Sequence, residues 1–411
     1  MFQWGKHGVR TSNATTKDSL PLIIGIVLIA ANMRGPLTAV GPLVDQICSS
    51  LHISGTLAGM LTTLPLFAFA LFSPAAPVLA RKYGTKMTLL FAVAVLTAGI
   101  LVRSWPGGIH IFVGTALIGL AICVCNVLIP SLIKRDFPDH IGIMTGIFSV
   151  SMSSFGAVGS GLSIPIALAL GWPGALRIWA LLSFLSCLIW LPQVLHEGRQ
   201  RRVSEAGGKN DIGQAAGQIM KINLLKSPVA WQVTFYSGFQ SMMFYCLIAW
   251  LPDILIQKGI VSSQAGFMLS AMQISCIPVI FLGSVLAGNK SNHRTLVLAG
   301  SLCYIIGLSG MLFTSGSITY IWAVLFGIAG GFTFSLSMMY ISMRTKTADQ
   351  AASLSGMAQS IGYMLAAFGP MLFGYLRDAI HDWRAPVFIM IIVACCTLTA
   401  GLLAARDRYV I

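Results

Sequence analysis

Residues 20–45 read LPLIIGIVLIAANMRGPLTAVGPLVD, a largely apolar stretch with one basic residue, Arg34. An α-helix rises about 1.5 Å per residue, so about 20 apolar residues cross the roughly 30 Å hydrocarbon core of a bilayer. The run is too long for the core of a signal peptide, and no small-residue cleavage site ends it. We therefore predict a retained transmembrane helix here, preceded by a polar cytoplasmic tail at residues 1–19.

Outward from this stretch, eleven further apolar segments of similar length follow, at residues 56–80, 87–102, 109–133, 141–170, 175–195, 229–256, 265–287, 296–313, 318–343, 351–375 and 385–405. Hydrophobic residues make up 56% of the 411 residues and charged residues only 9%, whereas a soluble domain carries about 25% charged residues. Most of the chain must therefore face lipid. We expect an all-α membrane protein with twelve transmembrane helices.

The longest polar stretch divides the twelve segments into six and six. It holds six basic residues and the flexible pair Gly207-Gly208. We therefore expect an N-terminal six-helix bundle, a cytoplasmic central loop, a C-terminal six-helix bundle and a cytoplasmic tail, at residues 20–195, 196–228, 229–405 and 406–411.

The net charge of +14 comes from 26 Lys and Arg against 12 Asp and Glu. Such an excess can indicate nucleic-acid binding, but basic residues also collect in the cytoplasmic loops of membrane proteins. With a cytoplasmic N-terminus, twenty basic residues fall on the inner side and five, Arg103 among them, on the outer side, and the last is Arg34. We expect a multi-pass protein of a bacterial inner membrane, with the lipid bilayer as its partner, no nucleic-acid partner and both termini cytoplasmic.

The sequence lacks the motifs of enzymes and of metal or cofactor sites. Its nine cysteines do not have zinc-ligand spacing, and it contains no Walker-type phosphate loop and no metalloprotease helix. We therefore expect no catalytic residue, no metal, no cofactor and no ATP-driven transport.

The loop after the second segment reads LARKYGTK at residues 79–86. It resembles the signature of major facilitator transporters at this place, which has a Gly, a Leu, an Asp-Arg pair, a Gly and a basic pair. Pro77 replaces the first Gly and Arg81 replaces the Asp, so the usual contact of that Asp with a neighbouring helix is lost here. The candidate gating residues of this loop are Arg81, Lys82, Gly84 and Lys86.

Longer stretches resemble the cyanate permease and nitroimidazole transporter family within that superfamily. They include NVLIP at residues 126–130, KRDFP at 134–138 and LSGMAQSIGY at 354–363. The resemblance covers nearly the whole chain from Leu20 to Asp407. It implies the major facilitator fold of two six-helix bundles and transport of a small solute that is often anionic or rich in nitrogen. We expect the transporter to be a monomer.

Arg34 lies in the middle of the first predicted helix, between apolar residues and Gly35-Pro36. A charge at this depth costs at least about 2.5–3.5 kcal/mol, and such residues are usually functional. No Asp or Glu lies in the middle of any predicted helix to pair with it. Arg34 either reaches the outer surface or backbone carbonyls, or it forms an anion site whose missing counter-charge is the substrate; we favour the anion site.

Other polar residues lie on helices that the resemblance places around the central cavity. Ser355, Gln359 and Tyr363 share one helix face at four-residue spacing. Ser and Thr in helices commonly bond to their own backbone or pack between helices, so we give them no role. The substrate-binding residues that we add to Arg34 are Asn126, Tyr245, Gln273, Gln359 and Tyr363 as hydrogen-bonding groups, and Trp250 as an apolar or stacking wall.

Gly35-Pro36 beside Arg34 and Pro252 beside Trp250 fall in the first helix of each half. Helices broken at matching positions are typical of transporter sites and hinges. We therefore predict that both helices are interrupted at these prolines.

These observations favour a secondary active transporter that carries a small cyanate-like anion or a nitro-heterocycle by alternating access. Two alternatives remain open: a membrane sensor on the same fold that does not transport, and a passive channel. The sensor would bind a ligand without solute flux, and the channel would show flux that does not saturate.

The basic-residue count predicts the outcome of cysteine labelling on a cysteine-free background. A membrane-impermeant maleimide added outside should label Cys introduced at Gly107 or Ser317 and should spare Cys introduced at Gly208. The reverse pattern would show that the orientation is inverted.

Overall fold

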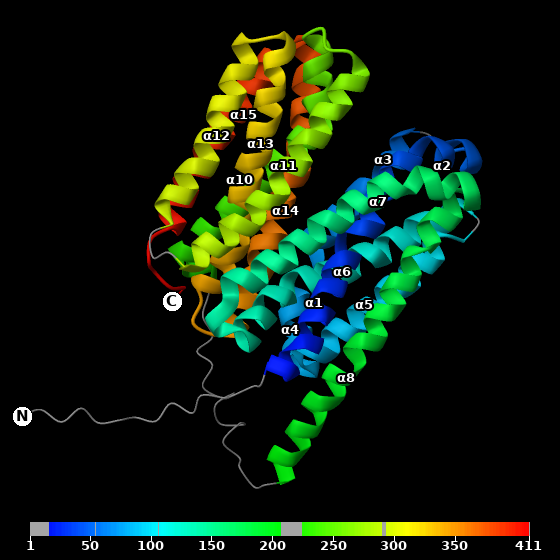
Figure 1. Ribbon diagram of the computed structural model, residues 1–411, viewed down its shortest axis with the longest axis vertical. Coiled ribbons are helices and arrows are strands. Elements are labelled where there is room, and N and C mark those ends of the chain that lie inside the picture. The colour runs from blue at the N-terminus through cyan, green and yellow to red at the C-terminus, as the bar shows by residue number, and fades with distance from the viewer. Residues whose placement is uncertain (1–15, 54, 106, 207–223, 290–292, 411) are drawn as a thin grey trace, which may run out of the picture.

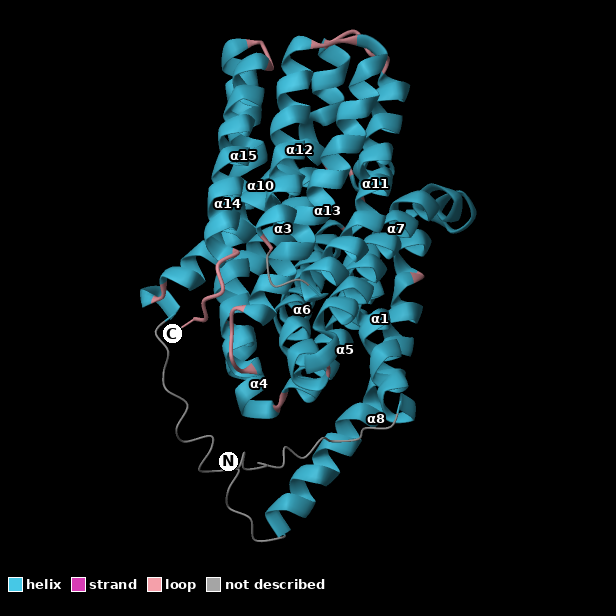
Figure 2. Cartoon of the chain, turned by 60° about the vertical axis from the view of Figure 1, so that its left-hand side comes forward, coloured by secondary structure: helices cyan, strands magenta, loops and turns pink. Residues whose placement is uncertain are grey.

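The computed structural model describes residues 16–53, 55–105, 107–206, 224–289 and 293–410. These residues form helices joined by short loops, and no strand occurs among them (Figure 2). In the predicted central loop, Leu224–Lys226 forms a single 3₁₀ turn.

The helices follow the predicted segments closely. The first half contains α1 Thr16–Thr38, α2 Val44–Leu51, α3 Gly55–Phe72, α4 Ala75–Tyr83, α5 Thr85–Arg103, α6 Gly108–Asp136, α7 Ile141–Arg177 and α8 Trp179–Ala206. The second half contains α10 Pro228–Gln257, α11 Ser262–Asn289, α12 Arg294–Phe313, α13 Thr319–Met343, α14 Ala348–Ile380 and α15 Arg384–Ala404.

By length and apolarity, nine described stretches are able to cross a membrane, and the bent pair α3–α4 makes a tenth. One stretch, Pro138–Leu195, contains two predicted segments, which separate at Gly171, where φ is +69°. The remaining segment, α14, spans 33 residues but carries more polar side chains. Together these helices account for the twelve predicted segments.

Two local details differ from the prediction. The second segment bends by 60° between α3 and α4, where Pro74 precedes α4 and the buried Ser73 hydroxyl donates to Phe69 O at 2.6 Å. The predicted interruptions at Gly35-Pro36 and Pro252 do not occur, because α1 runs to Thr38 and α10 runs to Gln257. A proline removes one backbone hydrogen bond, and neither helix breaks there.

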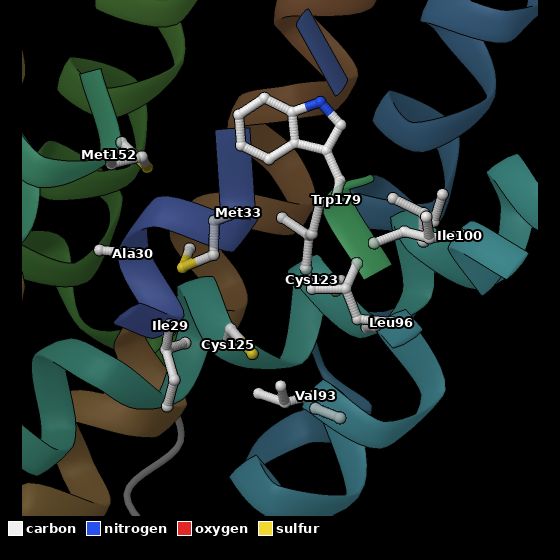
Figure 3. Packing of buried hydrophobic residues seen from close by; sticks show 14 of the residues in the cluster. Ile29, Ala30, Met33, Val93, Leu96, Ile100, Cys123, Cys125, Met152 and Trp179 are labelled. Carbon is white, nitrogen blue, oxygen red and sulfur yellow. The ribbon is translucent and has the colours of Figure 1, made fainter. Parts of the chain in front are cut away.

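Each half has its own apolar core. In the first half, side chains from α1, α5, α6, α7 and α8 interdigitate around Met33, Ile100 and Trp179 (Figure 3). In the second half, a separate cluster packs around Tyr304, Phe326 and Phe373. Each core is built mainly from helices of its own half, and Ala352 of α14 joins the first core from the other half.

The bundles meet where α7 packs on α11 and where α14 packs on α3, α4 and α6. At the opposite end the bundles are apart: the end of the first bundle that carries α2 lies away from the outer ends of α10 and α12 in the second (Figure 1). A methyl group added at Gly142 of α7 would lie 2.7 Å from Ser284 O and 3.0 Å from Gly288 Cα of α11. We call Gly142, Gly146, Ser284 and Gly288 the glycine seam. Here the two bundles touch backbone to backbone.

The glycine seam predicts that Gly142→Ala parts the bundles. The added methyl group meets backbone atoms that cannot turn aside, at a cost of about 1–3 kcal/mol. Labelling of Cys introduced at the fully buried Ser284, on a cysteine-free background, should therefore accelerate roughly tenfold. Gly161→Ala is the control, because a methyl group at Gly161, also on α7, meets nothing within 4 Å. Equal labelling rates in the two variants would contradict the role of the seam.

Candidate functional site

Arg34 of α1 lies between the two bundles. Its side chain is half-buried and passes Gly156 of α7, where an added methyl group would lie 3.0 Å from Arg34 Cγ. Its guanidinium carbon lies 5.2 Å from the ring centroid of Phe244, on α10 of the other bundle. Arg34 is therefore anchored in one bundle and in contact with the other.

Aromatic side chains gather around this guanidinium. Tyr245 of α10 interacts with Arg34, and Tyr363 of α14 lies close enough to interact electrostatically with the Arg34 guanidinium. The Tyr245 and Tyr363 rings are 6.5 Å apart, and the Tyr363 ring is 4.9 Å from that of Phe69 on α3. The group thus brings together residues of α1, α3, α10 and α14.

No carboxylate of the described residues forms an ion pair with Arg34. The ion pairs of these residues lie at helix ends and in loops, as between Lys86 and Asp136 at 3.9 Å. A cation over an aromatic face gains about 0.5–2 kcal/mol, which is less than the cost of placing the charge at this depth. The site therefore remains short of negative charge.

The turn that carries Arg34 is held tightly by its own bundle. Gly35 lies against the Trp179 ring, where an added methyl group would come within 2.4 Å. The Thr38 hydroxyl donates to Gly156 O at 2.7 Å, and Gly159 packs against Gly35 O. These contacts fix the direction of the Arg34 side chain.

Arg103, which we counted with the outer-side segments, supports the same turn. It ends α5 and is fully buried, with Nη1 donating to Pro36 O at 2.9 Å. Its Nε and Nη2 have no partner among the described residues. The long apolar helix continues to Arg103 and carries it into the bundle. Its only sequence signal is its position at the end of an apolar segment.

Three further candidates lie on helices around Arg34. Gln359 is buried one turn from Tyr363. Its Nε2 donates to Ser355 Oγ at 3.1 Å, while its Oε1 has no partner in the described part of the chain. Asn126 is nearly buried on α6 and makes no hydrogen bond with a described residue. Gln273 is exposed on α11, one turn before Cys276, which lies within electrostatic range of Arg34.

Trp250 is not brought to Arg34. Its indole N–H donates to Pro370 O at 2.9 Å, and its ring lies 5.3 Å from that of Trp383. Both partners belong to its own bundle, so Trp250 packs α10 against α14 and α15.

Sequence reasoning missed two residues near Arg34. Phe244, which lies over the guanidinium, was overlooked beside Tyr245 because one sequence cannot show which ring faces a distant helix. Asn32 is fully buried, and its amide donates to Ser186 Oγ at 2.7 Å and Leu28 O at 2.8 Å, which ties α1 to α8.

The loop with the transporter-like signature connects the bundles at the end opposite α2. Arg81 Nη1 lies 3.7 Å from Asp349 Oδ1 and 3.4 Å from Ser353 Oγ, both on α14. Lys82 instead lies 5.1 Å from the ring centroid of its neighbour Tyr83. Gly84, with φ +89°, separates α4 from α5. The basic group therefore lies in the last turn of α4 and the acidic group in the first turn of α14.

Comparison with known proteins agrees with this architecture. The family model described as Major Facilitator Superfamily matches residues 22–367. The chain is 37% identical to the 2-nitroimidazole transporter of Escherichia coli (strain K12), over 97% of this chain and 98% of that protein. It is 24% identical to the cyanate transport protein CynX of the same organism, over 88% and 92% of the two chains. The solved structure of the proton:xylose symporter XylE shares the fold, with a TM-score of 0.77 and 12% identity, over 95% of this chain and 98% of that chain.

These findings confirm the predicted family, the helical membrane fold and the expectation of transport rather than catalysis. The protein is a multi-pass membrane transporter that binds a small molecule, and it belongs to the major facilitator superfamily.

Proposed function

We propose that this transporter carries a small planar anion or a nitro-heterocycle, bound at Arg34, by alternating access. The observation that carries the proposal is the guanidinium of Arg34, which lies between the bundles without a carboxylate partner among the described residues and under the Phe244 ring. A guanidinium offers a planar fork of donors that matches two acceptor atoms at once. A nitro group or a carboxylate presents two such acceptors side by side, and linear cyanate presents one at each end.

The aromatic surroundings favour a flat solute. The rings of Phe244, Tyr245, Tyr363 and Phe69 offer faces and edges on which a flat ring stacks. The Oε1 of Gln359, which has no partner among the described residues, supplies an acceptor for an N–H group of the solute. The similarity to a 2-nitroimidazole transporter supports a ring-containing solute more strongly than the more distant similarity to a cyanate transporter.

Each remaining candidate takes a role consistent with its position. Arg34 is the electrostatic anchor, and Asn126 and Gln273 line the path from α6 and α11. Trp250 stabilises the outer end of the second bundle rather than touching the solute. The protein acts as a monomer in a bacterial inner membrane with both termini cytoplasmic.

Alternating access follows from the position of the site. Arg34 belongs to α1 and Phe244 to α10, so rocking of the bundles changes the contact between them. The loop residues Arg81, Lys82, Gly84 and Lys86 form the gate on the inner side, where Arg81 contacts α14.

Substitution of Arg34 tests the site. Arg34→Lys should keep the fold but lose roughly tenfold or more in affinity for 2-nitroimidazole or cyanate, because an ammonium cannot hold two acceptors in one plane. Arg34→Ala should abolish binding and leave thermal stability equal or higher, since an unpaired charge has been removed. Binding and melting temperature are measured on the same purified variants.

Arg384→Lys is the matched control, because the Arg384 side chain is 84% exposed at a helix start. If Arg34→Ala binds the solute as tightly as the parent, Arg34 is structural and the proposed site is wrong. Counterflow in proteoliposomes separates transport from sensing, since a sensor binds without flux and a channel shows no counterflow.

Arg81 stands where the family signature has an Asp, and it pairs with Asp349. This ion pair predicts that substitutions at its two residues compensate each other. Arg81→Asp and Asp349→Arg should each lower the melting temperature by placing like charges together, and the double exchange should restore it. Because both side chains are partly exposed, the coupling should be small, about 0.2–1 kcal/mol. Lys82→Asp makes the same charge change without the contact to α14 and should show no coupling with Asp349→Arg. A coupling of zero for the Arg81 pair would remove this contact from the gate.

A further inference from the structure

A cavity among the described residues has a volume of about 580 Å³. It lies between the bundles at the end where the glycine seam closes them, far from Arg34. The first bundle contributes Lys134, and the second contributes His293, Arg344, Lys346, Asp407 and Tyr409.

The walls of this cavity carry an excess of positive charge. Lys134 crosses from the first bundle, and its ammonium donates to Ser342 O, Thr345 O and Thr345 Oγ1, which are all uncharged. Arg344 is 2% exposed and pairs with Asp407, with Nη1 and Oδ1 2.9 Å apart. The ammonium of Lys346 lies 6.0 Å from the Tyr409 ring centroid. Among the described residues, the lining of this cavity thus holds one carboxylate and three basic side chains.

Donors remain available in the cavity. Arg344 uses Nε on Ala404 O, Nη2 on Ala405 O and His293 Nδ1, and one Nη1 hydrogen on Asp407. A guanidinium has five N–H groups, so one remains for a ligand. Lys346 and the Tyr409 hydroxyl add further donors at the same wall.

A ligand with several oxygens and a negative charge satisfies these conditions. Charge-assisted hydrogen bonds from Arg and Lys are among the strongest in proteins. Basic pockets between transmembrane helices on the cytoplasmic side bind the head groups of anionic lipids. The volume exceeds that of a bare phosphate and leaves room for the group that a phosphate carries.

We propose that this cavity binds a phosphate group, carried by an anionic phospholipid or by a soluble phosphate compound. The bound anion interacts with Lys134 of one bundle and with Arg344 and Lys346 of the other, so it stabilises the arrangement in which the bundles meet at this end. A ligand that favours one arrangement shifts the equilibrium by its difference in affinity, commonly about 5–150-fold.

The test measures how fast a maleimide labels Cys introduced at Ser284, on a cysteine-free background. Two probes are compared: glycerol 3-phosphate added to detergent-solubilised protein at matched ionic strength, and phosphatidylglycerol against phosphatidylcholine in nanodiscs. Either phosphate probe should slow labelling roughly tenfold. Lys346→Gln should remove most of this slowing, because it removes one of the positive charges that bind the phosphate. Since Lys346 is exposed, its loss leaves the interhelical contacts in place. Lys134→Gln should do the same.

Arg408→Gln is the control. Arg408 is an exposed basic residue between Asp407 and Tyr409, but it does not line the cavity. It should keep the full effect. Slowing by phosphatidylglycerol alone identifies a lipid head group, and slowing by glycerol 3-phosphate identifies a soluble ligand. The proposal is overturned if neither probe slows labelling, or if Lys346→Gln and Arg408→Gln respond alike.

Discussion

The burial of an arginine in an apolar helix without a carboxylate is the constraint on which the structure depends. A guanidinium at this depth must be oriented, since it would otherwise reach for the nearest water or carbonyl. Gly156, Gly159 and Trp179 confine the turn of α1 that carries it, and Arg103 binds the carbonyl of Pro36 behind it. The first bundle is thus built to hold one charge in one direction, toward aromatic rings of the second bundle.

The second bundle surrounds this charge with aromatic rings rather than with an acidic side chain. An internal carboxylate would neutralise Arg34 and would have to be displaced by any anionic solute. The rings of Phe244, Tyr245 and Tyr363 stabilise the cation weakly and leave its donors accessible. If the solute binds at Arg34 as proposed, the site selects it by shape and by acceptor geometry as much as by charge.

The sequence predicts the helices well because lipid imposes length and apolarity on each segment separately. It also predicts that Arg34 is a charge inside an apolar helix, since one charge in an apolar run is visible without a partner. It does not predict Phe244 as the neighbour of Arg34, the burial of Arg103 or the role of Trp250 within its own bundle. Each depends on which faces of distant helices meet, and a single sequence carries no record of that pairing. Proline was also a poor guide, because Pro36 and Pro252 lie in continuous helices while the bend at Pro74 went unpredicted.

Where Gly142 meets Gly288, the closing surface consists of main chain. Glycine is the smallest residue, so every missense change at such a position adds volume and none removes it. Random mutation therefore acts on this surface in a single direction, toward separation of the bundles. Tighter closure must arise elsewhere, through side chains such as Lys134 and Arg81 that reach across from the first bundle. The glycines set the shortest distance to which the bundles approach. The basic side chains around the glycines are where evolution is able to adjust how long the bundles stay together.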